Sequence, residues 1–316
     1  MTAQSRDVTS PTAADGTVGL PIVLGTNTFG WTNTPKQACA VLDAYVESGG
    51  VAIDTADSYS HHVPGNAGGE SETMIGEWVR SRGRDRVSIA TKVSAKPSHP
   101  GLSAANVRSA VDKSLRRLQT DVIDLYYAHY DDPAVPLEET ATVFSELVDR
   151  GKIRAIGLSN YEPARIEAWM EIAREEGLHA PIALQPPYNL MARDFERALR
   201  PLAERHGLAV FPYFALASGF LTGKYRDESA EGSARRASAV RYLDARGLRV
   251  LDALDSAAAA HGAPLSAVAI AWLRMQPTVS APISSARTPA QLHDLIRGAR
   301  LELSAGEIRA LAEASS

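Results

Sequence analysis

Residues 122–129 read VIDLYYAH, a run of mainly apolar and aromatic residues that ends on a histidine. β-branched and aromatic residues in such a run favour a strand. Most apolar side chains occupy consecutive positions rather than alternate ones, which is typical of a parallel strand covered on both faces. The run therefore indicates an interior strand of a parallel sheet, with His129 at its carboxyl end.

Seven other short runs along the chain share this character. They are Ile22–Leu24, Val51–Asp54, Val87–Lys92, Ala155–Ser159, Ile182–Gln185, Leu208–Tyr213 and Val279–Ile283. Helical patterns fill the intervals, the clearest being an apolar stripe from Val107 to Leu118. Eight strands, each followed by a helix, predict an α/β fold: a (β/α)8 TIM barrel as a single domain over residues 18–316. The rival architecture is a doubly wound sheet, but no G-x-G-x-x-G motif follows any of the strands.

Capping signals mark the beginnings of several helices. Thr34, Pro35 and Gln37 are typical of an N-cap, a first turn and a capping-box partner. Ser304 and Glu307 form a similar S-x-x-E pattern before the last helix.

The long interval before the eighth strand is expected to hold helices over 239–261 and 265–275. The polar residues 226–238 before them predict a mobile loop, and residues 1–17 a flexible, solvated tail.

Composition excludes several classes of protein. Of the 316 residues 45% are hydrophobic and 22% charged, which excludes a disordered chain, and the net charge of −4 gives no sign of a surface for nucleic acid. The single cysteine, Cys39, excludes an internal disulfide framework and a multi-cysteine metal site. No stretch approaches the roughly 18 apolar residues of a membrane helix, and residues 1–17 lack the apolar core of a signal peptide. We therefore expect a cytoplasmic protein that binds neither membrane nor nucleic acid.

Polar residues close the predicted strands on the face where barrels carry their chemistry. Asp54, Lys92 and His129 end three successive strands, and Tyr59 follows the first of them in a loop. Each has an ordinary interpretation: a cap, a lysine reaching solvent, a structural histidine and a loop aromatic. Their convergence on one barrel mouth favours a site, because buried charges are costly unless they are paired.

Several motifs share an order along the chain with a known family. They are Asp54–Tyr59, Gly69–Glu72, Ile75–Gly76, Thr91–Val93, Asp124–His129, Gly157–Tyr161, Gln185–Asn189, Leu221–Tyr225 and Ala286–Pro289. Over about residues 18–312 the chain thus resembles the aldo-keto reductases, whose members transfer hydride between a nicotinamide cofactor and a carbonyl group without a metal.

This resemblance implies roles for the four residues. Tyr59 would be the general acid, with the ammonium of Lys92 lowering the high pKa of its phenol. Asp54 would pair with Lys92 and keep it charged. His129 would donate a hydrogen bond to the carbonyl oxygen of the substrate.

The resemblance also implies an NADP(H) site. Ser159, Asn160 and Gln185 offer partners for the carboxamide of the nicotinamide, and Tyr213 offers a flat face for its ring. Arg287, just before the predicted helix start Thr288–Gln291, is placed to bind a 2′-phosphate and favours NADP over NAD. Alternatively, Ser159 and Asn160 cap a helix, Tyr213 is a core aromatic and Arg287 a surface arginine. Further candidate cofactor contacts are Thr26, Leu216, Ser218, Ser285, Gln291 and Asp294.

One departure lies near the expected diphosphate. Many relatives carry Ser-Pro-Leu after the aromatic residue, whereas this chain has Phe214-Ala215-Leu216 and so lacks a hydroxyl there. Leu216, Ser218 and their backbone would have to serve instead.

The expected substrate is a small carbonyl compound in an open pocket with broad tolerance. Phe29, Trp31, Tyr130 and the 226–238 loop are expected to border it. No metal is expected at the neighbouring His61 and His62, because adjacent positions rarely share one ion.

Two other functions remain open. A cofactor-binding regulatory barrel, like the potassium-channel β subunits, would keep the same cofactor residues. An aldolase or hydrolase would use Lys92 as a Schiff base. The oligomeric state is left open.

Overall fold

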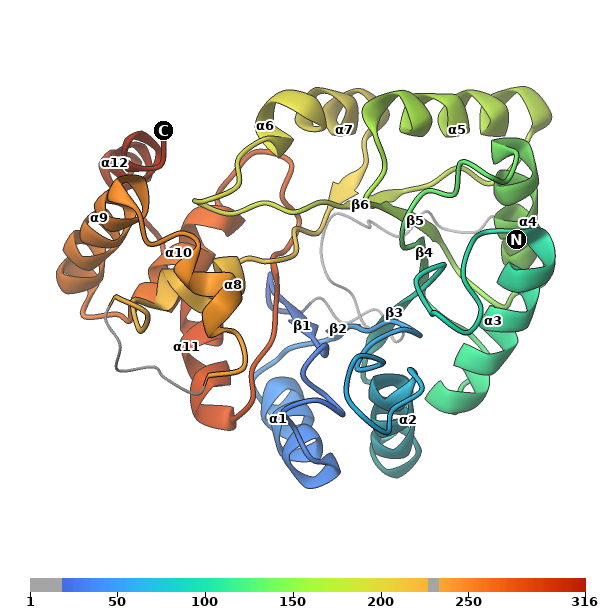
Figure 1. The fold of residues 1–316 in the computed structure, drawn as a ribbon, viewed down its shortest axis with the longest axis horizontal. Coiled ribbons are helices and arrows are strands. Elements are labelled where there is room, and N and C mark those ends of the chain that lie inside the picture. Colours follow the sequence, from blue (N-terminus) through green and yellow to red (C-terminus); the bar gives the residue numbers. More distant parts are fainter. Residues whose placement is uncertain (1–18, 227–232) are drawn as a thin grey trace.

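The structure is a computed structural model that describes residues 19–226 and 233–316, and its centre is one parallel sheet. The strands are β1 (Val23–Gly25), β2 (Ala52–Asp54), β3 (Ser88–Val93), β4 (Leu125–Ala128), β5 (Ile156–Ser159), β6 (Ala183–Gln185), β7 (Ala209–Val210) and β8 (Ile283–Ser284). Their order in the sheet is β7-β6-β5-β4-β3-β2-β1-β8. The sheet curls into a barrel ringed by helices (Figure 1), so the predicted (β/α)8 architecture is confirmed.

The barrel closes between β7 and the segment that leads into β8. Val210 forms an isolated parallel bridge with Val279, and the amide of Ser280 donates to the carbonyl of Val210 at 2.8 Å. The amide of Ile283 donates to the carbonyl of Pro212 at 2.8 Å. Pro282 has no N–H to donate to a ladder. The regular strand β8 is therefore shorter than the predicted Val279–Ile283 and lies further along the chain.

The outer layer is helical. Its members are α1 (Pro35–Glu47), α2 (Glu70–Arg82), α3 (Ala104–Leu118), α4 (Leu137–Asp149), α5 (Pro163–Glu176), α6 (Phe195–Ala198), α7 (Arg200–His206), the 3-10 helix η1 (Ala217–Thr222), α8 (Arg236–Val240), α9 (Ala245–His261), α10 (Leu265–Arg274), α11 (Pro289–Arg300) and α12 (Ala305–Ala314). α9 and α12 pack together outside the ring (Figure 1). The expected capping boxes at Thr34 and Ser304 are both present.

The region after β7 differs from the prediction. The predicted helix 239–261 is interrupted, because Asp244 accepts a hydrogen bond from the amide of Gly247 at 2.7 Å and thereby begins α9 anew. The predicted loop 226–238 overlaps the start of α8. The rest of that loop, residues 227–232, and the predicted tail 1–17 lie outside the described residues.

A membrane span was also sought among the described helices. None of them alone is long and apolar enough; α9 and α10 together meet the length and composition requirement, but they meet at a bend of 97°.

Strand alternation separates the outer core from the barrel interior. Side chains such as Leu24, Ile53 and Tyr126 belong to the large cluster beneath the helices. Two small separate clusters, centred on Val23 and on Tyr127, lie on the other strand faces and fill the interior. Because successive side chains in a strand point to opposite faces, each residue two positions beyond an interior residue also points inward. The inward-facing positions at the carboxyl ends of the strands therefore carry the side chains at the mouth.

Tyr127 occupies space that a neighbouring side chain would otherwise take. A Cβ atom built on Gly157, its register partner on β5, would meet the Tyr127 ring at 2.4 Å. Glycine at this position therefore makes room for a large ring inside the barrel.

A buried charged cluster joins α2, α3 and β3 below the mouth. Glu72 is fully buried; its carboxylate accepts from the hydroxyl of Thr91 at 2.6 Å and pairs with the Arg117 guanidinium at 2.6 Å. Asp57 is 2% exposed, and its Oδ1 has no hydrogen-bond partner. Burial, followed by repulsion from Glu72, raises the pKa of Asp57 to about 7.

Gly157→Ala should lower the free energy of unfolding by about 1–3 kcal/mol, because the interior has no space for the added methyl group. The measurement is urea unfolding. Gly306→Ala in α12 is the control, since the atom nearest to its added Cβ, Ser304 Oγ, would lie 3.8 Å away. Equal unfolding midpoints for the two variants would contradict the interior packing.

The pKa of Asp57 generates a second prediction. Its folded-state value of about 7 exceeds the usual unfolded value, so its contribution to stability is full below about pH 4 and is lost as the pH rises through 7. Asp57→Asn removes this loss. The variant should therefore gain roughly 1–4 kcal/mol relative to wild type between pH 5 and pH 8.

Urea unfolding at the two pH values measures this difference. The control is Asp121→Asn, at an exposed position, whose free energy of unfolding should change between the two pH values as that of wild type does. If the free energy of unfolding of Asp57→Asn also changed as that of wild type does, Asp57 would ionise normally in the folded state.

Candidate active site

The Lys92 ammonium lies at the centre of the mouth with no exposure to solvent. Its Nζ donates to Asp54 Oδ2 at 2.7 Å, to the carbonyl of Thr55 at 2.7 Å and to the Tyr59 hydroxyl at 2.8 Å. An ammonium has three N–H donors, so every donor is used. The buried charge is therefore both paired and fully hydrogen-bonded.

Asp54 connects this ammonium to two more groups. Its Oδ2 also accepts from the Tyr59 hydroxyl at 3.2 Å, and its Oδ1 accepts from Gln185 Nε2 at 2.8 Å. The side-chain amide of Gln185, predicted to contact a cofactor, thus also orients the aspartate.

The ionisation of Tyr59 differs from the prediction. The sequence predicts that Lys92 lowers the pKa of Tyr59. Instead burial, followed by the charge of Asp54, raises the pKa of Tyr59 well above its ordinary value. Burial also lowers the pKa of Lys92, against the attraction of Asp54. Tyr59 is therefore a neutral phenol at neutral pH and retains its proton.

His129 follows β4 and faces Tyr59. The ring centroids are 6.3 Å apart at an interplanar angle of 73°, and the Nδ1 atom is buried without a hydrogen-bond partner. Burial, followed by the charge of Lys92, lowers the pKa of His129 well below its ordinary value. The imidazole is therefore neutral and has one N–H to donate.

These groups lie at one end of a cavity of about 520 Å³. Predicted site residues on its wall are Asp54, Tyr59, His129, Tyr130, Ser159, Asn160, Gln185, Tyr213, Leu216, Ser218, Ser285, Arg287, Gln291 and Asp294. The volume and the mixed polar and aromatic lining are typical of a small-molecule site.

Four predicted residues are not on that wall, and one of them is Lys92, which lies behind Asp54 and Tyr59. Thr26 is fully buried and donates its hydroxyl to the carbonyl of Asp54 at 2.9 Å, so it supports the strand end. Phe29 is fully buried in the core and does not border the pocket. Trp31 lies beside the cavity, where the Arg235 guanidinium covers its ring at 5.5 Å.

Ser159, Asn160 and Tyr213 form a linked polar group on one wall. The amide of Asn160 donates to Ser159 Oγ at 3.0 Å and to the carbonyl of His129 at 2.9 Å. Its Oδ1 accepts from the Tyr213 hydroxyl at 2.6 Å. These bonds hold Asn160 in a left-handed conformation with φ 57°.

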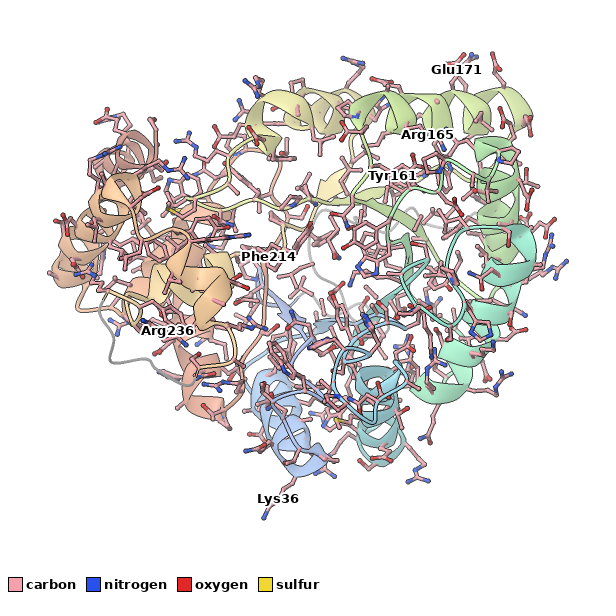
Figure 2. All side chains as sticks on the ribbon, viewed as in Figure 1. Lys36, Tyr161, Arg165, Glu171, Phe214 and Arg236 are labelled. Atoms are coloured by element: carbon pink, nitrogen blue, oxygen red, sulfur yellow. The ribbon has the colours of Figure 1, made fainter. Side chains whose placement is uncertain are left out.

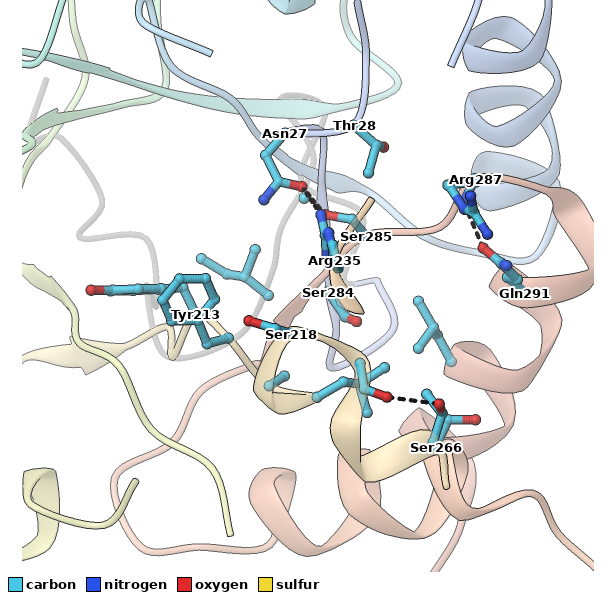
Figure 3. Close-up of a pocket in the computed structure, with 18 of the residues that line it drawn as sticks. Asn27, Thr28, Tyr213, Ser218, Arg235, Ser266, Ser284, Ser285, Arg287 and Gln291 are labelled. Carbon is cyan, nitrogen blue, oxygen red and sulfur yellow. Dashed lines mark hydrogen bonds between the residues drawn. The ribbon is translucent and has the colours of Figure 1, made fainter. Parts of the chain in front are cut away.

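The far end of the cavity meets the N-terminus of α11. Thr288 caps this helix, and the side chain of Gln291 accepts from the amide of Arg287 at 2.9 Å (Figure 3). The carbonyl of Arg287 accepts from Asn33 Nδ2 at 2.8 Å. The Arg287 backbone is thus fixed at a helix end that attracts anions.

The sequence did not single out several lining residues, among them Asn27, Phe214, Lys224 and Arg235. Arg235 lies in the 226–238 stretch that was expected to border the pocket, and for this residue that expectation is confirmed. Arg235 donates to Asn27 Oδ1 at 3.0 Å, and Ser285 Oγ donates to the same oxygen at 2.8 Å (Figure 3). Burial lowers the pKa of Arg235; the nearby Tyr225 opposes this shift and Arg287 adds to it. The only signal was the arginine pair within the polar stretch 226–238.

His61 and His62 make separate contacts. His61 Nδ1 lies 2.7 Å from the carbonyl of Ser58, while the His62 ring packs edge-on against Trp31. Within residues 19–226 and 233–316, no group of three His, Cys, Asp or Glu side chains is arranged to hold a metal ion.

Comparisons with known proteins identify the family of the chain. The model of the aldo/keto reductase family matches residues 21–316. The aldo-keto reductase YhdN of Bacillus subtilis is 35% identical, over 87% of this chain and 83% of that protein. Norsolorinic acid reductase B of Aspergillus parasiticus is 30% identical, over 93% of this chain and 80% of that protein. A putative voltage-gated potassium channel subunit beta of Schizosaccharomyces pombe is 35% identical, over 78% of this chain and 74% of that protein.

The fold, the arrangement at the mouth and a family match over nearly the whole described chain point the same way. The chain belongs to the aldo-keto reductase family, and an oxidoreductase role follows from that membership.

Proposed function

We propose that the protein reduces aldehydes or ketones to alcohols with NADPH, with Tyr59 as the proton donor. The observation that carries the proposal is the Lys92 ammonium, which donates to both Asp54 and Tyr59, two residues of the cavity wall. If Lys92 and Asp54 formed only a structural ion pair, they would not need the protonated phenol of Tyr59 and the neutral imidazole of His129 beside them. We further propose that this reaction takes place in the cytoplasm.

The residues present fit a nicotinamide dinucleotide phosphate. Arg235 is a largely buried cation that donates to the amide oxygen of Asn27, so a phosphate would supply a negative charge. Arg287 and the start of α11 offer a second anion position. Ser159, Asn160 and Tyr213 offer amide-matching groups and a flat ring near the acid.

A bound nicotinamide would supply the hydride. Tyr59 would donate its proton to the substrate oxygen, because an alkoxide is a far stronger base than a phenolate. Lys92, at 2.8 Å from the Tyr59 oxygen, would stabilise the resulting phenolate. The neutral His129 would donate a hydrogen bond to the same substrate oxygen and hold it near Tyr59.

Asp54 and Gln185 would keep the ammonium in position. The carboxylate balances the charge of Lys92, and the Gln185 amide holds its second oxygen at 2.8 Å. Neither group needs to contact the substrate for this role.

Two other functions are weighed against this one. Lys92 is fully buried and uses all three donors, which argues against a Schiff-base nucleophile. A regulatory role has support in the similarity to the potassium channel subunit beta, and only turnover separates the two. The neutral phenol held beside Lys92 favours the enzyme.

Tyr59→Phe should lower kcat for aldehyde reduction by about 10²–10⁴-fold while NADPH binding is kept, because only the proton donor is removed. NADPH oxidation measures the rate, and quenching of protein fluorescence measures binding. Tyr161→Phe is the control, since that buried hydroxyl has no partner and lies beside α5 (Figure 2). Equal rates in Tyr59→Phe and wild type would reject the assignment.

Arg287→Ala should weaken NADPH binding by about 10–100-fold and NADH binding far less, because only NADPH carries a 2′-phosphate. Titration of both cofactors measures the ratio. Arg309→Ala, an exposed arginine on α12, is the matched control. Equal weakening of both cofactors would mean that Arg287 does not bind the 2′-phosphate.

A further inference from the structure

Three buried hydroxyl groups next to the active-site residues form a hydrogen-bonded chain. They belong to Thr26, which follows β1, to Thr55, which follows β2, and to Ser71, the second residue of α2. All three residues have no exposure to solvent. A buried hydroxyl is costly unless it is hydrogen-bonded. These three hydroxyls bond to one another, so they join β1, β2 and α2 in a single connected unit.

The chain of bonds has a direction and two ends. The Thr55 hydroxyl donates to Ser71 Oγ at 2.9 Å, and Ser71 Oγ lies 2.8 Å from Thr26 Oγ1 and 3.0 Å from the Thr26 carbonyl, either of which accepts its proton. The Thr26 hydroxyl donates to the carbonyl of Asp54 at 2.9 Å. A hydroxyl has one proton to donate, and these bonds use all three protons. The chain therefore starts at residue 55 and returns to residue 54.

These two end residues are the ones whose oxygens accept from Lys92. Its Nζ donates to Asp54 Oδ2 at 2.7 Å and to the Thr55 carbonyl at 2.7 Å. The backbone there is held as well, because the amide of Thr26 donates to the Asp54 carbonyl at 3.0 Å and the amide of Thr55 to the Ala90 carbonyl at 2.9 Å. The hydroxyl of Thr55 adds an attachment to α2, outside the sheet.

The bond between Thr55 and Ser71 also closes the loop that carries Tyr59. That loop runs from the end of β2 at Asp54 to the start of α2 at Glu70. The N-cap of α2, Gly69, makes no side-chain hydrogen bond, and the Ser71 hydroxyl reaches the strand ends instead of capping its own helix. One hydrogen bond thus joins the two ends of the loop, and Tyr59 lies between them.

We infer that Thr55 and Ser71 are positioning residues for the proton transfer, whose hydroxyl bond holds the Thr55 carbonyl against the Lys92 ammonium and fixes the loop of Tyr59. This inference rests on the proposed function and adds to it two residues that do not line the cavity. A reacting group keeps a productive geometry only when the groups that support it are themselves locked by hydrogen bonds and packing.

Variants at both ends of the bond test the inference in the full-length protein. Thr55→Val removes the hydroxyl and keeps the branched shape, and Ser71→Ala removes its partner. Each should lower kcat by about 10-fold, measured with NADPH and the aldehyde that wild type reduces fastest, because the acid and the ammonium are less well placed. Thr55→Ser, which keeps a hydroxyl, should recover most of that loss.

The control for hydroxyl removal is Ser145→Ala on α4. The Ser145 hydroxyl is also buried and accepts from the amide of His179 at 3.0 Å, but it belongs to the outer layer. Its removal should lower stability without lowering kcat. A loss of kcat in Ser145→Ala equal to that in Ser71→Ala would overturn the inference, since any buried hydroxyl would then serve.

The pH profile separates positioning from a general loss of structure. A hydrogen bond to a charged group stabilises its charged form, so a weakened bond to the Thr55 carbonyl should lower the pKa of Lys92. The fall of kcat/KM at high pH should therefore begin about 0.5–1 pH unit lower in Thr55→Val and Ser71→Ala than in wild type. A smaller folded fraction would lower the rate at every pH alike, and profiles of unchanged position would overturn the inference.

A last measurement needs no turnover. Heteronuclear NMR of the lysine ammonium groups follows the exchange of their protons with water. Of the lysines in residues 19–226 and 233–316 only Lys92 is buried, so its signal identifies itself by slow exchange. That exchange should be about 3- to 10-fold faster in Thr55→Val and Ser71→Ala. If wild type reduced no aldehyde, the proposed function would fail, and the exchange would still decide: faster exchange in both variants supports the positioning of Lys92, and unchanged exchange overturns it.

Discussion

The fully buried ammonium of Lys92 is the constraint on which the mouth of this barrel depends. A charge without solvent contact must find all its partners in the protein, and here they come from the Asp54 carboxylate, the Thr55 carbonyl and the Tyr59 hydroxyl. All three partners lie at or just after the end of β2, the neighbour of β3. The parallel register of these two strands therefore decides whether the site can form, and removing the side-chain oxygen of Asp54 or Tyr59 would leave a buried donor of Lys92 without that partner.

Strand alternation explains how one sheet gathers so many polar groups. Lys92 lies two positions after Ala90, His129 two after Tyr127, and Gln185 two after Ala183. Each apolar member lies in the interior cluster, so each polar one emerges on the same side at the carboxyl end. The inward-facing positions of the strands thus carry apolar side chains inside the barrel and, at the carboxyl ends, the polar side chains of the site.

Most of the fold and the grouping of polar side chains at the mouth could be predicted because both depend on local patterns: apolar runs for strands and ionisable residues at their ends. What failed depended on tertiary context. Phe29 was expected at the pocket, yet it is buried in the core. The 226–238 stretch was expected to border the pocket, but nothing in the sequence indicated that Arg235 within it bonds to Asn27. The direction of the Tyr59 pKa shift also required the structure, since burial outweighs the neighbouring ammonium and neither burial nor distance is visible in sequence.

The Tyr127 ring inside the barrel bears on how protons and small molecules reach Tyr59. Gly157 makes room for that ring, which packs with Ala183 and Ala209 inside the barrel. Tyr59 and His129 face the cavity, whose wall also includes Phe214 and Tyr130. In the proposed reaction, the proton that returns to Tyr59 between turnovers would reach it from this cavity.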